Sequence, residues 1–342
     1  MALKSTELSS IAPEGGAWAG EIRRRIVRVA ESIGLSKERR SDVALVASEL
    51  ATNLEKHGAL SPVIRYGVTR SDGGEKGILI VSEDRGPGIP DPERALQDRY
   101  STAGTLGGGL GAIRRLSDDF AIYSEIRRPG GSLPGTVVIS RIWNHPPASA
   151  APFDCEALTR PKPGEIDNGD GVSFWQSGSD LQVAVIDGLG HGPQAKKATQ
   201  AAQKQLEGTG LLPLRAVLEQ LHSELQKTQG AVAGIFRIDL KEGRAAYAGV
   251  GNIDSRIYGA HPARPISLNG SLGVVSPRHR EEAFPFEKGD FFVLTSDGIS
   301  TKWEPGDYAK WGLPDPLLLA ALLLRDHSRP TDDATVAVGR IG

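Results

Sequence analysis

Residues 183–192 read Val-Ala-Val-Ile-Asp-Gly-Leu-Gly-His-Gly, an apolar run that ends at a carboxylate and continues with three glycines. The β-branched run predicts a buried strand, and the pattern becomes helical from Ala195. Asp187 therefore stands at a strand end, and the glycines after it let main chain approach a ligand. A tight hairpin turn is the structural alternative, because Asp-Gly is a common two-residue turn signal.

The same arrangement of a carboxylate at a strand end recurs along the chain. Asp297 follows an apolar run, Asp332 and Asp333 precede another, and Asp170 stands just ahead of a third. If these strands pack in one core, their carboxylates come together and repel one another, so the cluster needs cations. Oxygen ligands favour Mg²⁺ or Mn²⁺ over zinc. The pattern predicts a two-metal hydrolytic site.

Four motifs in order carry a family resemblance: residues 187–192, 249–252, 295–298 and 332–335. They resemble the SpoIIE/RsbX branch of the PPM-type phosphatases, which are metal-dependent Ser/Thr protein phosphatases, over about the second half of the chain. The resemblance implies two Mn²⁺ or Mg²⁺ ions with Asp187 in the catalytic centre. The implied metal ligands are Asp170, Asp187, the backbone carbonyl of Gly188, Asp297 and Asp332.

Two residues near these motifs have competing interpretations. Asp333 competes with Asp332 for the last ligand position, and the family pattern puts the ligand first, which favours Asp332. His191 is a candidate general acid, but we interpret it as a loop histidine packed against its own turn.

The first half of the chain carries polar residues in a second ordered set. A helix predicted at 41–57 has Glu49 and Asn53 one turn apart. A predicted strand at 78–81 leads into Asp-Arg-Gly-Pro-Gly at 84–88. Residues 102–111 form a glycine-rich loop ahead of a helix, where backbone N–H groups are open to an anion. As a lone motif this loop is weak, because most such runs are flexible linkers.

Taken together, these segments resemble the GHKL (Bergerat) ATP-binding fold, and most of all the RsbT and RsbW kinases of anti-sigma and stress-switch systems. The resemblance covers about residues 15–143. It implies that Asn53 binds the Mg²⁺ of ATP, that Glu49 acts on an attacking hydroxyl, and that Asp84 accepts from the adenine amino group. The polar stretch at 90–103 would be a lid. The implied nucleotide-binding glycines are Gly86, Gly88, Gly104, Gly107, Gly109 and Gly111.

Composition sets broad limits. A chain of 342 residues with net charge −2 gives no electrostatic argument for nucleic acid or an anionic membrane. The single cysteine, Cys155, excludes an intrachain disulfide. No signal peptide is recognisable, and the most apolar run, 317–324, is too short to span a bilayer and predicts a buried helix. We expect a cytoplasmic protein, and its oligomeric state stays open.

The predicted fold class is α/β with two domains. An N-terminal GHKL α/β sandwich at 15–143 is followed by a Pro- and Ala-rich linker at 144–157. A PPM-type β-sandwich flanked by helices occupies 158–342.

The predicted function is that of a signalling protein. The second domain would hydrolyse phosphoserine or phosphothreonine on a partner, and the resemblance implies a phosphorylated STAS-domain or stressosome-like protein. The first domain would bind ATP and transfer phosphate as a Ser/Thr kinase, or only sense ATP and regulate the phosphatase. A non-catalytic partner-switch binding module is a further alternative, against which the intact Glu49 and aspartates argue.

Overall fold

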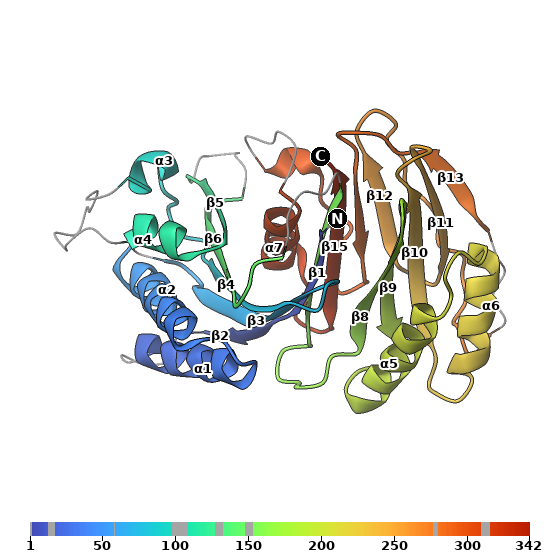
Figure 1. Cartoon of the computed structure of the whole chain (residues 1–342), viewed down its shortest axis with the longest axis horizontal. Helices are drawn as coiled ribbons and strands as arrows, with labels where there is room; N and C mark the ends of the chain where they lie inside the picture. The colour runs from blue at the N-terminus through green and yellow to red at the C-terminus, as the bar shows by residue number, and fades with distance from the viewer. Residues whose placement is uncertain are drawn as a thin grey trace. The chain divides into compact units, whose positions relative to one another are not determined.

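The chain folds into two compact units in the computed structural model, which describes residues 2–12, 18–57, 59–97, 109–126, 133–147, 153–275, 280–308 and 315–342 (Figure 1). The N-terminal unit consists of Thr6–Ala148 and Trp303–Asp326. The C-terminal unit consists of Met1–Ser5, Ser149–Lys302 and His327–Gly342. Residues 303–326, which lie within the range predicted for the second domain, belong to the N-terminal unit, and residues 1–5 belong to the C-terminal unit.

The N-terminal unit is built on an antiparallel sheet. Its strand order is β2–β3–β4–β6–β5. The strands are β2 (Ser9–Ile11), β3 (Val63–Ser71), β4 (Lys76–Glu83), β5 (Asp119–Glu125) and β6 (Gly135–Trp143). Its helices are α1 (Trp18–Ser32), α2 (Lys37–Lys56), α3 (Pro92–Ala95), α4 (Gly109–Leu116) and α7 (Pro316–His327), whose last residue belongs to the C-terminal unit.

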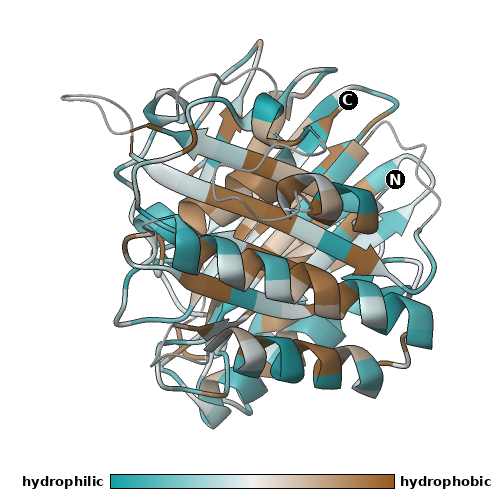
Figure 2. Cartoon of the chain, turned by 90° about the vertical axis from the view of Figure 1, so that its left-hand side faces the viewer, coloured by the Kyte–Doolittle hydropathy of each residue, from teal (hydrophilic) through white to brown (hydrophobic). Residues whose placement is uncertain are grey.

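Helices α1 and α2 bury their apolar sides against this sheet. On α1 the buried residues Ile22, Ile26 and Ala30 recur every four positions, which is the spacing of one helix face. They share one core with Ile64 of β3 and Ile80 of β4. Figure 2 shows the apolar strands of this unit behind its more polar helices. Helix α7 confirms the buried helix predicted at 317–324, because nine of its 12 residues are buried.

The C-terminal unit contains two antiparallel sheets. In one, the order is β12–β14–β15–β7; in the other, it is β13–β11–β10–β9–β8. The first comprises β12 (Asp254–Tyr258), β14 (Phe291–Thr295), β15 (Ala334–Ile341) and β7 (Phe153–Arg160). The second comprises β13 (Glu282–Pro285), β11 (Arg244–Val250), β10 (Ala231–Asp239), β9 (Asp180–Gly188) and β8 (Asp170–Ser177). Helices α5 (Pro193–Glu207) and α6 (Leu214–Leu225) pack on the second sheet.

Strand β9 lies between two apolar cores, which explains why residues 183–186 are all apolar. Val183 and Val185 belong to the core that also contains Phe292 of the other sheet. Ala184 and Ile186 belong to the core under α5 and α6. Successive strand residues point to opposite faces, so both faces of β9 are buried and every position must be apolar.

Strand β7 begins at Phe153, inside the range 144–157 that the sequence predicts as linker. The short strand β1 (Ala2–Glu7) was also not predicted. Charged residues interrupt both sequences, yet Glu156 of β7 is 2% exposed and its Oε1 accepts from Lys4 Nζ at 2.7 Å. The two partners lie at opposite ends of the first half of the chain, so no local pattern reveals that their charges compensate each other.

Within the described residues, no helix combines the length and apolar character needed to cross a membrane.

We expect Lys4→Ala to destabilise the C-terminal unit by about 3–5 kcal/mol, because it leaves the buried Glu156 carboxylate without its cation. Denaturant unfolding of the full chain measures the effect. The double variant Lys4→Met/Glu156→Leu should recover most of the loss. The control is Arg215→Ala, whose ion pair with Glu219 on α6 is exposed, so its transition should not move. Equal midpoints for Lys4→Ala and Arg215→Ala would contradict the prediction.

Candidate functional site

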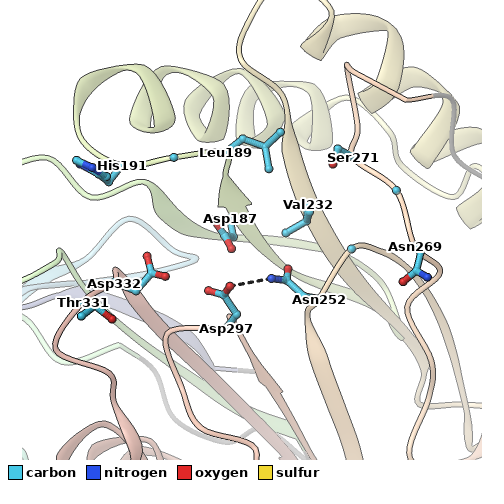
Figure 3. A pocket seen from close by; sticks show the side chains of 13 residues that line it. Asp187, Leu189, His191, Val232, Asn252, Asn269, Ser271, Asp297, Thr331 and Asp332 are labelled. Carbon is cyan, nitrogen blue, oxygen red and sulfur yellow. Dashed lines mark hydrogen bonds between the residues drawn. The ribbon is translucent and has the colours of Figure 1, made fainter.

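The C-terminal unit contains a pocket of about 540 Å³ lined by acidic residues from several strand ends. Figure 3 shows the carboxylates of Asp187, Asp297 and Asp332 directed into one space. Asn252 completes this group, because its Nδ2 donates to Asp297 Oδ2 at 2.8 Å. The structure therefore brings together three of the four aspartates predicted to bind metal.

Strand geometry places these carboxylates. Asp187 lies two residues after Val185 on β9, so it continues the side that faces the core between the two sheets. Strand β14 pairs antiparallel with β15, with Thr295 opposite Val336. The end of β14 and the start of β15 therefore meet at one edge of their sheet, which is where Asp297 and Asp332 stand.

The fourth predicted ligand, Asp170, lies opposite Asp187 in the pairing of β8 with β9. It is 6% exposed and is not among the residues that line the pocket. Ser296 Oγ donates to Asp170 Oδ2 at 2.6 Å and accepts from Thr335 N at 3.0 Å. Asp170 is therefore a buried carboxylate beside Asp187, fixed by a serine that sequence reasoning missed within the 295–298 motif.

Burial raises the pKa of several of these carboxyl groups. It is the largest cause of the raised pKa of Asp187, followed by repulsion from the neighbouring carboxylates, Asp170 first. Burial likewise raises the pKa of Asp170, against the hydrogen bond from Ser296. Burial and then Asp332 raise the pKa of Asp297, while Arg329 and Asn252 act in the opposite direction. Burial and the neighbouring carboxylates thus disfavour the ionised forms of Asp170, Asp187 and Asp297.

Asp332 and Asp333 have different surroundings. Asp332 lines the pocket. Asp333 is 3% exposed, and its two carboxylate oxygens accept from the backbone N–H groups of Lys162 at 2.8 Å and Gly169 at 3.0 Å. Asp333 therefore ties the loop before β8 to the start of β15, and Asp332 is the one of the pair that faces the pocket.

Gly188 has no room for a side chain. A Cβ at this position would overlap the backbone carbonyl of Ala195 on α5. Its N–H donates to Gly169 O at 3.0 Å. This close approach explains why glycine follows Asp187 and holds the backbone beside the carboxylate in one place.

His191 lies on the pocket wall and pairs with Glu165, from its Nδ1 to Oε1 at 2.9 Å. The sequence interpretation, packing against its own turn, did not include this partner. Glu165 lies in the loop between β7 and β8, and nothing in its local sequence signals the contact. The imidazole is thereby oriented at the mouth of the pocket, with 56% of its side chain exposed.

The donor set can be compared with what a divalent cation requires. Within the part of the chain that the structure describes, no three His, Cys, Asp or Glu side chains are close enough to hold one ion among themselves. Mg²⁺ usually keeps several waters and binds through one or two carboxylates. The carboxylates of Asp187, Asp297 and Asp332 line one pocket, and burial raises the pKa of Asp187 and Asp297. Such a donor set fits hard cations that retain water ligands.

In the N-terminal unit, Glu49 and Asn53 are half-buried on α2, one turn apart as predicted. Helix α4 packs against α2 through the core that contains Ile113. Gly109 and Gly111 lie at the start of α4, and Gly111 is buried. Gly104 and Gly107 lie outside the described residues.

Residues 84–88, the Asp84 box, follow β4 in a fixed turn. The Gly86 N–H donates to Asp84 Oδ1 at 2.6 Å, and the Asp84 N–H donates to Thr136 O at 2.9 Å. Gly88 has φ +79°, and a Cβ there would overlap Glu125 O. Burial raises the pKa of Asp84, while the Gly86 N–H and then Arg325 oppose the shift. The turn therefore presents a half-buried carboxylate on a backbone that only glycine permits.

Comparison with known proteins agrees with this division of the chain. Residues 17–141 match the family of the histidine kinase-like ATPase domain, and residues 177–341 match the family of stage II sporulation protein E (SpoIIE).

Three individual proteins are similar to parts of the chain. The serine/threonine-protein kinase RsbT of Bacillus subtilis (strain 168) is 36% identical over 97 residues, which are 28% of this chain and 71% of RsbT. The phosphoserine phosphatase RsbX of the same strain is 24% identical over 175 residues, 50% of this chain and 87% of RsbX. A crystal structure of RsbX in complex with magnesium covers 56% of this chain and 96% of its own, with 22% identity and a TM-score of 0.51.

The third protein comes from a study of the bacterial stressosome as a modular system adapted to control secondary messenger signalling. Its structure is 30% identical with a TM-score of 0.52, over 55% of this chain and 99% of its own. These findings confirm the predicted resemblance and the α/β fold class. Through its first half the chain belongs to the family of RsbT-like histidine kinase-like ATPase domains, and this domain is joined to a region, 177–341, that matches the SpoIIE family.

Proposed function

We propose that the C-terminal unit hydrolyses phosphoserine or phosphothreonine on a partner protein with two Mg²⁺ or Mn²⁺ ions. The observation that carries the proposal is the meeting of three carboxylates from separate strand ends in one pocket. The proposed ligands are Asp170, Asp187, the Gly188 carbonyl, Asp297 and Asp332. Bound cations would offset the carboxylate repulsion and supply Lewis-acid activation of a water for attack at phosphorus.

The residues around these ligands would fix their positions. Asn252 donates to Asp297, and Ser296 donates to Asp170. Asp333 accepts from two backbone N–H groups and so holds the chain next to Asp332. The charged ligands are therefore oriented before any cation binds, which limits the reorganisation that binding requires.

For the N-terminal unit we propose binding of ATP with Mg²⁺. Asp84 would accept from the adenine amino group, and Asn53 would bind the Mg²⁺. The glycines of the Asp84 box and of the loop before α4 would lie along the nucleotide: Gly86, Gly88, Gly104, Gly107, Gly109 and Gly111. Support comes from the half-buried Asp84 carboxylate on its fixed turn and from the similarity to RsbT.

The proposed substrate is a phosphorylated STAS-domain or stressosome-like protein in the cytoplasm. The names of RsbT and RsbX, and the stressosome study of a similar structure, support a partner of this kind. The pocket itself is compatible with a protein substrate. Val274 and Val275, which follow the pocket residue Ser271, expose 60% and 58% of their surface, and such apolar side chains suit contact with a protein.

A second candidate activity is phosphate transfer by the N-terminal unit. Glu49 lies one turn from Asn53 on α2, so a base and a Mg²⁺ ligand would share one helix face. The alternatives are an N-terminal unit that only senses ATP, and a non-catalytic partner-switch module.

A turnover assay tests the main proposal. The full chain is incubated with a phosphoserine STAS-domain protein, with Mn²⁺ or with EDTA, and released phosphate is measured. We expect phosphate release with Mn²⁺, no phosphate release in EDTA, and renewed phosphate release when Mn²⁺ is restored. Full turnover in metal-free buffer would exclude the two-metal proposal. Incubation of the unphosphorylated partner with labelled ATP separates the kinase alternative from ATP sensing.

Asp187→Asn is expected to reduce phosphate release by at least about 100-fold, because a neutral amide balances less of the cation charge. In EDTA the same variant should be more stable than the wild type. The pKa of Asp187 is raised in the folded state, so ionisation destabilises the fold as pH rises above the ordinary carboxyl range. Thermal unfolding between pH 4 and pH 8 should show the wild type losing stability that Asp187→Asn retains.

The matched control for this variant is Asp180→Asn, at the other end of β9. It should keep turnover and follow the wild-type dependence of unfolding on pH. If the thermal stability of Asp187→Asn and of the wild type depended on pH in the same way, the ionised Asp187 carboxylate would not destabilise the fold.

Asp84→Asn is expected to weaken ATP binding by about 1–3 kcal/mol, or about 5- to 150-fold, because the amide mispairs a buried acceptor. Equilibrium titration of the full chain with ATP and with GTP measures both affinity and selectivity. Asp72→Asn, in the exposed turn between β3 and β4, is the control and should bind as the wild type does. Equal affinity of the wild type for ATP and GTP would overturn the assignment of Asp84.

A further inference from the structure

We propose that an adenine nucleotide at the Asp84 box is an effector of the C-terminal metal site, and that residues 303–326, the insert segment, carry the effect. The inference rests on the proposed function of both sites and adds the route between them. The insert segment lies within the region that matches the SpoIIE family, yet it folds as part of the N-terminal unit. In the chain it stands between the two pocket carboxylates Asp297 and Asp332.

Inside the N-terminal unit, the end of the insert segment contacts the Asp84 box directly. Arg325 Nη1 donates to Asp84 O at 3.4 Å, and Arg85 Nη2 donates to Arg325 O at 2.6 Å. Arg85 Nη1 also pairs with Asp326 Oδ1 at 3.0 Å. Asp84 therefore offers its carboxylate to the nucleotide while its backbone is held by the insert segment.

These contacts form a buried charged network. The side chains of Arg325 and Asp326 are 2% and 0% exposed, and they pair with each other through two hydrogen bonds at 2.9 and 2.8 Å. Arg325 also lies 5.9 Å from the centre of the Tyr123 ring, which meets the Tyr308 ring edge-on. Separating buried partners leaves uncompensated charge and is costly, so the insert segment must follow a displacement of the Asp84 box.

The residues that flank the insert segment, 298–300 and 327–329, are joined to each other inside the C-terminal unit. Ile299 and Ser328 form an antiparallel bridge, and Ser300 N donates to His327 O at 2.8 Å. Arg329 N donates to Gly298 O at 2.7 Å, directly after Asp297. The chain therefore leaves the C-terminal unit after Lys302 and re-enters it at His327, and the two segments are hydrogen-bonded to each other near the pocket residue Asp297.

Arg160 connects this return point to the last carboxylate. Its Nη2 donates to Arg329 O at 2.7 Å, and its Nη1 donates to Asp332 O at 3.1 Å. Arg160 is 5% exposed, so its position is fixed by packing. A displacement of α7 would thus reach Arg329 through the backbone of residues 327–329, and Arg160 links Arg329 O to Asp332 O by two hydrogen bonds.

Coupling of this kind is reciprocal. If nucleotide changes the affinity of the pocket for metal, then metal changes the affinity for nucleotide by the same factor, and such factors are typically about 5- to 150-fold. The full chain is assayed with p-nitrophenyl phosphate at buffered free Mn²⁺, with and without saturating ADP. We expect the half-saturating Mn²⁺ concentration to shift at least about fivefold. ADP affinity, measured without and with saturating Mn²⁺ at constant Mg²⁺, should shift by the same factor.

Arg85→Met tests the route. It removes the contacts of Arg85 with the insert segment, while Asp326 keeps its paired hydrogen bonds with Arg325. The ADP affinity and the turnover of the folded variant are each measured directly, and we expect the fivefold shift to be abolished. Arg70→Met, exposed on β3 of the same unit, is the control and should keep the shift. Tyr308→Leu, which removes the ring contact with Tyr123, should reduce the shift in the same way and serves if Arg85→Met does not fold.

The possible failures are distinct. If the wild type does not bind ADP or does not turn over substrate, the proposed function of that unit fails. If both activities are present and neither affinity shifts with the other ligand, the coupling is overturned. If the shift is undiminished in Arg85→Met and Tyr308→Leu, the insert segment does not carry it.

Discussion

Repulsion between desolvated carboxylates is the constraint on which the C-terminal unit depends. Asp170 and Asp187 lie opposite each other on the paired strands β8 and β9, and Asp297 and Asp332 stand at the ends of β14 and β15 of the other sheet. Burial, followed by repulsion from neighbouring carboxylates, raises the pKa of Asp187, and burial raises that of Asp170, so the ionised forms of these two side chains work against folding. The apolar core between the two sheets holds the strand ends in place despite this cost. The site is thus a region of stored electrostatic strain that bound cations would relieve.

Much of this site could be predicted from the sequence, because each carboxylate stands at the boundary of a strand-like run. Asp187 follows four apolar residues, and both faces of that strand are indeed buried. The supporting contacts could not be predicted. Glu165 meets His191 and Asp333 meets the N–H groups of Lys162 and Gly169 only after the chain has folded. Local sequence determines where a strand ends, but not which distant polar group lies beside it.

The N-terminal unit shows the same limit. The spacing of Glu49 and Asn53 and the glycines of the Asp84 box are local features, and α2 and the turn after β4 lie where these features predicted them. The charged strand β7 was taken in part for linker, because the pair between the buried Glu156 and the distant Lys4 cannot be seen in the local sequence. That α7 packs in the N-terminal unit could not be predicted from the sequence either. Its uniformly apolar sequence indicates a buried helix but does not say which core receives it.

The placement of residues 303–326 also bears on how the molecule is made. Synthesis on the ribosome proceeds from the N-terminus, and domains generally fold as units as they emerge. Here the N-terminal unit lacks α7, and with it the partners of Arg85, until residue 326 of 342 has been added. Residues 1–5 in turn wait for β7 before Lys4 meets Glu156. Neither unit is complete until α7 and the strand β15 that follows it have been added, so the two units reach their final structures almost together.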